Sequence, residues 1–146
     1  MPDGKEIPAK EVIRDNELDL AYIRPLQRQD APMPHVDLAD SGDVEILDYV
    51  VALNRLGQVA NRVNAAAFEQ IEAIVRKPRT FYVPSSSVTS TNQGSIAFTL
   101  DGKVLGLFVL RSIQATGSPS NDNVAGIILP AADILDGAEQ APGFDE

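Results

Sequence analysis

The sequence predicts a mostly β fold, and three observations carry that prediction. Short apolar runs rich in β-branched residues recur along the chain, separated by polar turns. Asp101-Gly102 stands between two of these runs, and this dipeptide is a strong short-range signal of a two-residue β-hairpin turn with positive φ at both positions. Pro130 then opens one short helical segment, 131–140, because proline is well tolerated in the first turn of a helix.

The remaining elements are expected in chain order. In the run 18–24, Leu18, Leu20 and Tyr22 are expected on one face, with the intervening residues on the other. The run 103–111 is apolar enough to be buried on both faces. Residues 141–146 are expected to fray at the end of the chain. Strands are predicted over 6–14, 18–24, 45–53, 81–83, 95–100, 103–111 and 124–129.

One segment, 61–75, is ambiguous. Its alanines and glutamates favour helix, and Phe68, Ile71 and Val75 also fit helical spacing. Val63, Ile71 and Ile74 fit a strand instead. Local propensity favours the helix, which would leave an unrelated α+β interaction module open as an alternative.

Composition excludes several functions. The 146 residues carry 12 basic and 21 acidic side chains, a net charge of −9, which argues against nucleic-acid binding. The absence of cysteine and the single histidine, His35, leave no basis for a disulfide or a multi-histidine metal centre, so no cofactor or metal is expected. No apolar stretch is long enough to span a membrane, and the start of the chain lacks a signal peptide, so we expect no membrane insertion.

Three segments resemble, in order, the trypsin-like serine proteases of the HtrA/DegP type. Residues 15–23, DNELDLAYI, resemble the strand D-x-x-x-D-L-A-x-[IL] that bears the acid of the catalytic triad. Residues 101–107, DGKVLGL, are similar to the hairpin that follows the nucleophile loop. Residues 123–130, NVAGIILP, resemble the last strand before the C-terminal helix. Weaker matches at 34–41 and 46–53 lie between the first two.

The resemblance covers about 15–140 and implies a fold. That fold is a trypsin-like double β-barrel, of which the chain would hold the second part of barrel 1 and all of barrel 2, with a short C-terminal helix. It implies a strand rather than a helix at 61–75. We therefore expect one peptidase-like domain over 1–146 that lacks the first strands of barrel 1, whose open strand edges would allow a homo-oligomer.

The resemblance also implies site residues, and here the chain departs from the pattern. Asp19 matches the triad acid. The family's nucleophile motif G-N-S-G-G falls on residues 91–95, TNQGS, where Asn92 and Gly94 match. Gln93 stands at the position of the nucleophilic serine, and Thr91 and Ser95 replace glycines, which disfavours the loop that forms an oxyanion hole.

No histidine matches the triad base, because His35 follows Asp19 instead of preceding it. Serine chemistry needs that base. We therefore expect a non-catalytic homologue, retained for binding a peptide or protein, with Ser85–Ser87 in the region that lines the family's substrate pocket. The alternative is an active serine endopeptidase, in which a missing N-terminal segment supplies the histidine and Ser95 serves as a substitute nucleophile. Members of the family often work outside the cytoplasm.

Overall fold

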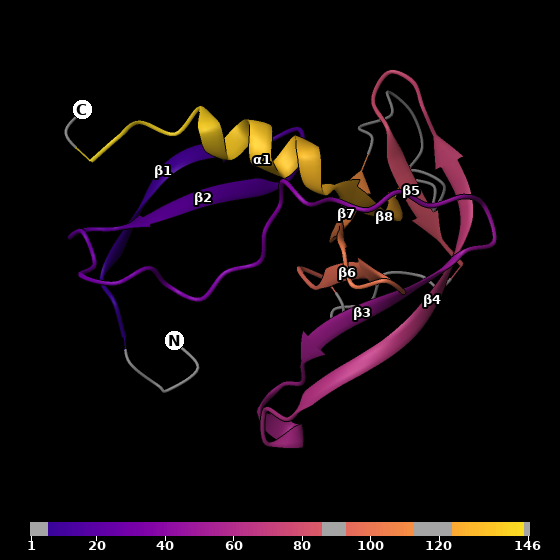
Figure 1. The fold of residues 1–146 in the computed structure, drawn as a ribbon, viewed down its shortest axis with the longest axis horizontal. Helices are drawn as coiled ribbons and strands as arrows, with labels where there is room; N and C mark the ends of the chain where they lie inside the picture. The colour runs from indigo at the N-terminus through magenta and orange to yellow at the C-terminus, as the bar shows by residue number, and fades with distance from the viewer. Residues whose placement is uncertain (1–5, 86–92, 113–123, 145–146) are drawn as a thin grey trace.

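The computed structural model describes residues 6–85, 93–112 and 124–144. Over these ranges the chain forms strands, one 3-10 turn and one α-helix (Figure 1). The strands are β1 (Ala9–Asp15), β2 (Leu20–Pro25), β3 (Tyr49–Arg55), β4 (Asn64–Val75), β5 (Phe81–Pro84), β6 (Ile96–Thr99), β7 (Val104–Ser112) and β8 (Val124–Pro130). The 3-10 turn η1 (Gln58–Ala60) joins β3 to β4, and α1 (Ala131–Glu139) follows β8. Within the described ranges, no helix has the length and apolar character needed to cross a bilayer.

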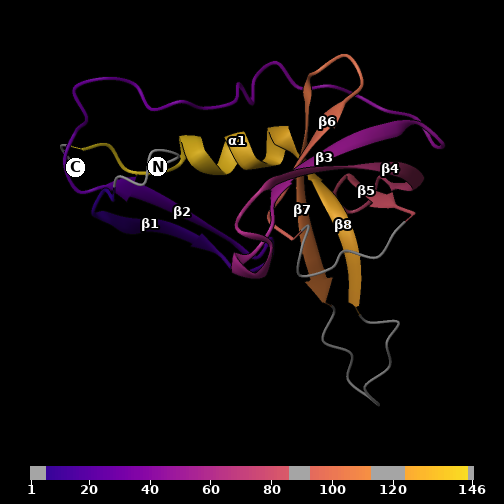
Figure 2. The same cartoon turned by 90° about the horizontal axis from the view of Figure 1, so that it is seen from below.

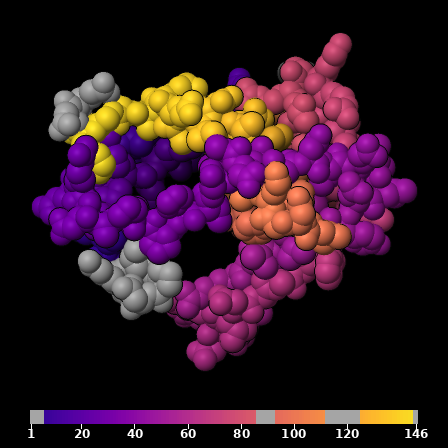
Figure 3. All heavy atoms as spheres, in the orientation of Figure 1, coloured from indigo at the N-terminus to yellow at the C-terminus, as the bar shows by residue number. Residues whose placement is uncertain are grey.

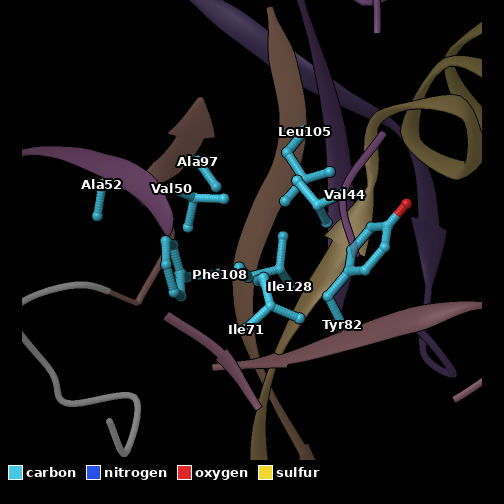
Figure 4. Packing of buried hydrophobic residues seen from close by; sticks show 9 residues of the cluster. All are labelled: Val44, Val50, Ala52, Ile71, Tyr82, Ala97, Leu105, Phe108 and Ile128. Carbon is cyan, nitrogen blue, oxygen red and sulfur yellow. The ribbon is translucent and has the colours of Figure 1, made fainter. Parts of the chain in front are cut away.

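Six strands close into a barrel in the order β3-β4-β5-β8-β7-β6. Closure leaves no open edge in this sheet, and alternate residues of each strand fill the interior. Phe108 of β7 is fully buried in one apolar cluster with Val50 of β3 and Ile71 of β4 (Figure 4). The mostly β fold with a barrel and a C-terminal helix, as the sequence predicts, is confirmed.

The segment 61–75 forms a strand, as the family resemblance implies and against its local helical preference. All seven residues of β3 pair with β4, from Tyr49 opposite Gln70 to Arg55 opposite Asn64. Pairing of this length, with Ile71 fully buried in the barrel, outweighs helix propensities of a few tenths of a kcal/mol per residue. The helix on which an α+β module would depend is therefore not present at this position.

Strands β1 and β2 form a separate two-stranded antiparallel sheet beside the barrel. Helix α1 leaves the barrel at the end of β8 and lies over this hairpin (Figures 1 and 2). The hydroxyl of Tyr22 in β2 donates to the carbonyl oxygen of Ile134 in α1 at 3.0 Å. Buried Leu18 in the β1–β2 turn belongs to a second apolar cluster with Val109 of β7, which attaches the hairpin to the barrel.

Three predicted strand starts are wrong by a few residues. The strand predicted over 6–14 begins only at Ala9. Leu18 and Asp19 lie in the β1–β2 turn, and β2 begins only at Leu20, although Leu20 and Tyr22 do share the more buried face. The run 45–53 does not enter its strand before Tyr49. The backbone N–H of Glu45 donates to the carboxylate of Asp48 at 2.8 Å, which closes a turn over the first residues of that run.

The hairpin between β6 and β7 forms as predicted, but its turn has a different geometry. Gly102 has φ +87°, whereas Asp101 is not among the residues with positive φ. Thr99 pairs with Lys103, since its N–H donates to the Lys103 carbonyl oxygen at 2.9 Å, which leaves a three-residue loop. Such loops place glycine at their last position, where positive φ is required, so the two-residue turn is corrected to a three-residue one.

Candidate functional site

The loop that matches the family's nucleophile motif ends against β7. The backbone N–H of Gly94 donates to the carbonyl oxygen of Phe108 at 2.8 Å, and the N–H of Phe108 donates to the carbonyl oxygen of Ser95 at 2.9 Å. Gly94 has φ +78°, a conformation that side chains disfavour. These bonds hold Gln93, which is exposed, at the rim of the barrel just before β6.

Asp19 lies at the tip of the β1–β2 hairpin. The side-chain Oδ1 of Asp15 accepts hydrogen bonds from the N–H groups of Glu17 at 2.9 Å and Leu18 at 3.0 Å, which folds the turn. Asp19 follows with φ +54° and is exposed. A hydrogen bond to Glu11 is the main reason why the pKa of Arg14 is raised, and the nearby charge of Asp19 adds to it.

The fold brings both predicted positions to neighbouring residues of one strand. Phe108 of β7 anchors the loop that carries Gln93 and Gly94. The next residue, Val109, packs in the cluster that contains Leu18, the residue before Asp19. The loop that carries Gln93 and the β1–β2 turn therefore both contact β7, at adjacent residues.

The other predicted residues are placed less favourably for catalysis or lie outside the described ranges. Ser95 is 6% exposed, and its carbonyl oxygen is bonded to Phe108. His35 is exposed in the connection between β2 and β3, with its Nδ1 2.9 Å from the carbonyl oxygen of Met33. Thr91, Asn92, Ser86 and Ser87 fall outside the described residues.

A groove of about 650 Å³ opens beside the loop. One wall is formed by Gln93, Gly94 and Ser95, and the other by the far end of the β3–β4 hairpin. That hairpin projects from the body of the molecule in Figures 1 and 3. The volume lies within the usual range for ligand pockets, and the lining includes Gln93, the residue that the motif resemblance aligns with the nucleophile.

The hairpin wall contains residues that the sequence did not single out. Arg55 ends β3, Asn64 begins β4 opposite it, and Asn54 precedes Arg55. The only available signal was that polar Asn54 and Arg55 directly follow the apolar run 49–53, at the point where the strand leaves the core. Their position beside the loop depends on tertiary structure, which no local pattern reveals.

Two solved structures share the fold. The chain has a TM-score of 0.63 to the MamO protease domain from Magnetospirillum magneticum, at 19% identity, over 90% of this chain and 67% of that one. It has a TM-score of 0.59 to an inactive serine-to-alanine mutant of Rv3671c from M. tuberculosis, at 20% identity, over 95% of this chain and 69% of the other. The chain therefore shares the fold of these trypsin-like protease domains.

Sequence comparison adds relatives among the serine endoproteases. No known family profile matches the chain. Two curated DegP-like periplasmic serine endoproteases, from Rickettsia conorii and Rickettsia prowazekii, are 26% identical over 141 and 138 residues, or 90% of this chain. The chain spans 26% of the length of each. Over most of its own length the chain is therefore similar in sequence to DegP-like serine endoproteases.

Proposed function

We propose that this chain is a trypsin-like protease homologue without hydrolytic activity, which binds an extended peptide in the groove beside residues 93–95. One observation carries the proposal: in the motif resemblance at 91–95, Gln93 aligns with the family's nucleophilic serine, and it lies exposed on a loop that is hydrogen-bonded to β7. A carboxamide has no group that can form and release an acyl intermediate.

The residues around Gln93 supply no replacement chemistry. The chain has one histidine, and His35 lies in the exposed connection between β2 and β3, bonded locally to Met33. Without an imidazole to take its proton, a serine hydroxyl at neutral pH is a poor nucleophile. Ser95 is the nearest described serine, and it is buried. Asp19 then remains as the acid of a triad whose other two members are absent from this chain.

The groove supports peptide binding as the function that this chain has kept. It is bordered by a protease-like loop and by a hairpin that together keep about 650 Å³ open to solvent. A peptide-binding surface depends on shape and hydrogen-bonding groups rather than on the nucleophile, so it can persist after the nucleophile is lost.

A fluorophosphonate probe tests the catalytic half of the proposal, since it reacts only with an activated serine. We expect no adduct by intact-mass spectrometry under conditions that label trypsin fully. A stoichiometric adduct at Ser95, absent from a Ser95→Ala variant, would show an active endopeptidase with a displaced nucleophile and would overturn the proposal.

A further inference from the structure

The groove beside residues 93–95 has an unusual charge for this chain. The protein carries a net charge of −9, yet none of the described residues that line the groove is a carboxylate. Among those lining residues, Arg55 alone is charged. A protein with a large negative net charge repels anions over most of its surface. A groove that carries a cation is therefore a favoured place for an anionic group to bind.

The guanidinium of Arg55 is oriented by the hairpin. Its Nε donates to the carbonyl oxygen of Arg62 at 2.8 Å, across the turn that joins β3 to β4. That bond uses Nε, and the two terminal nitrogens form a separate pair of donors. A guanidinium held through Nε presents a planar pair of donors, which matches the two oxygens of a carboxylate.

The rest of the lining suits a polypeptide. Asn64 and Gln93 contribute side-chain amides, which donate to and accept from peptide groups. Leu53 and Ile96 provide apolar surface. At Gly94 a Cβ atom would meet nothing within 4 Å, so a ligand backbone has room to approach the loop there. The groove thus combines one anion-binding group with peptide-like polar groups and apolar contacts.

We infer that the groove recognises a carboxylate on an extended peptide, with Arg55 as the residue that sets this preference. The inference rests on the proposed peptide-binding function and adds the chemical class of the ligand. The carboxylate has two possible sources, an acidic side chain or a free C-terminus, and both present the same two oxygens to the guanidinium.

Fluorescence anisotropy with four labelled heptapeptides tests the inference. All four consist of valine and serine; one carries a central glutamate, one the matched glutamine, and each is made with a free or an amidated C-terminus. The full chain is titrated against each peptide, alongside the variants Arg55→Gln and Arg55→Lys. Arg62→Gln is the matched control, because it removes the same charge from the same hairpin outside the groove lining.

We expect peptides with a carboxylate to bind about five- to tenfold more tightly than the fully neutral peptide, since the pair is partly exposed. Arg55→Gln should remove that difference, Arg55→Lys should keep part of it, and Arg62→Gln should keep nearly all. Preference for the glutamate peptide with an amidated end identifies a side-chain carboxylate, and preference for the free acid without glutamate identifies the C-terminus.

Two results would overturn the inference, and only one of them would also reject the proposed peptide binding. Equal affinity for all four peptides, unchanged by Arg55→Gln, would reject carboxylate recognition and leave peptide binding standing. Absence of binding by every peptide to a folded chain would reject both the inference and the peptide-binding half of the proposed function.

Discussion

Replacing Leu18 by alanine should weaken the attachment of the β1–β2 hairpin to the barrel. Leu18 is 7% exposed and packs with Val109, Ile127 and Leu129 on the outer face of β7 and β8. It lies directly before Asp19, so this contact also fixes where the hairpin tip sits relative to the loop that carries Gln93.

The size of the effect follows from the packing around Leu18. The substitution removes three carbon atoms, worth about 0.8 kcal/mol each in transfer free energy. The void already present beside Leu18 is only about 10 Å³, so the contact is nearly complete and its loss leaves a new cavity. Because the residue lies in a turn that can partly collapse, we expect a loss of about 2–3 kcal/mol in the free energy of unfolding.

Urea unfolding followed by circular dichroism measures the change. Leu100→Ala is the matched control, since Leu100 is 66% exposed in the β6–β7 turn and its loss should cost no more than about 0.5 kcal/mol. Hydrogen exchange should also show weaker protection of β1 and β2 in the Leu18 variant. If Leu18→Ala costs no more than the control and exchange is unchanged, the hairpin is not held by this contact.

Three further outcomes are expected. Gly106→Ala should destabilise the barrel by at least about 3 kcal/mol, because the added Cβ would lie 1.8 Å from the carbonyl oxygen of Leu129. At Gly57 an added Cβ would meet nothing within 4 Å, so Gly57→Ala should change the urea midpoint little. Burial raises the pKa of Tyr82, so the stabilising contribution of its hydroxyl is complete below about pH 10 and is lost as pH rises above that value. The difference between the urea midpoints at about pH 8 and about pH 11 should therefore be smaller in Tyr82→Phe than in the unmodified chain. Gln93→Ser should remain unlabelled by fluorophosphonate, because restoring the hydroxyl does not restore a base, and labelling of this variant would contradict the assignment.

Sequence reasoning located the fold best where several local signals agreed. The apolar run of β7 is buried on both faces, inside the barrel at Phe108 and against the hairpin at Val109, as its composition predicts. It was least reliable at β4, where alanine and glutamate favour a helix. That segment is a strand because β3 is available to pair along its length, a fact that no local window contains.

In the candidate site, too, local sequence signals pointed to some residues and not to others. Motifs in chain order singled out Asp19 and Gln93 as site candidates, and the segments that carry them contact adjacent residues of β7. The groove wall at Arg55 and Asn64 could not be read, because it depends on how far the β3–β4 hairpin extends past the start of β6. Residues that meet only through the fold leave no spacing signature in the sequence.

We propose that this domain binds peptide without cleaving it. To test this, the chain is incubated with the labelled glutamate heptapeptide until binding is complete by anisotropy, and the mass of the recovered peptide is then determined. We expect the bound peptide to be recovered intact at every time point. Cleavage products that accumulate with time, and that disappear in the Ser95→Ala variant, would contradict it.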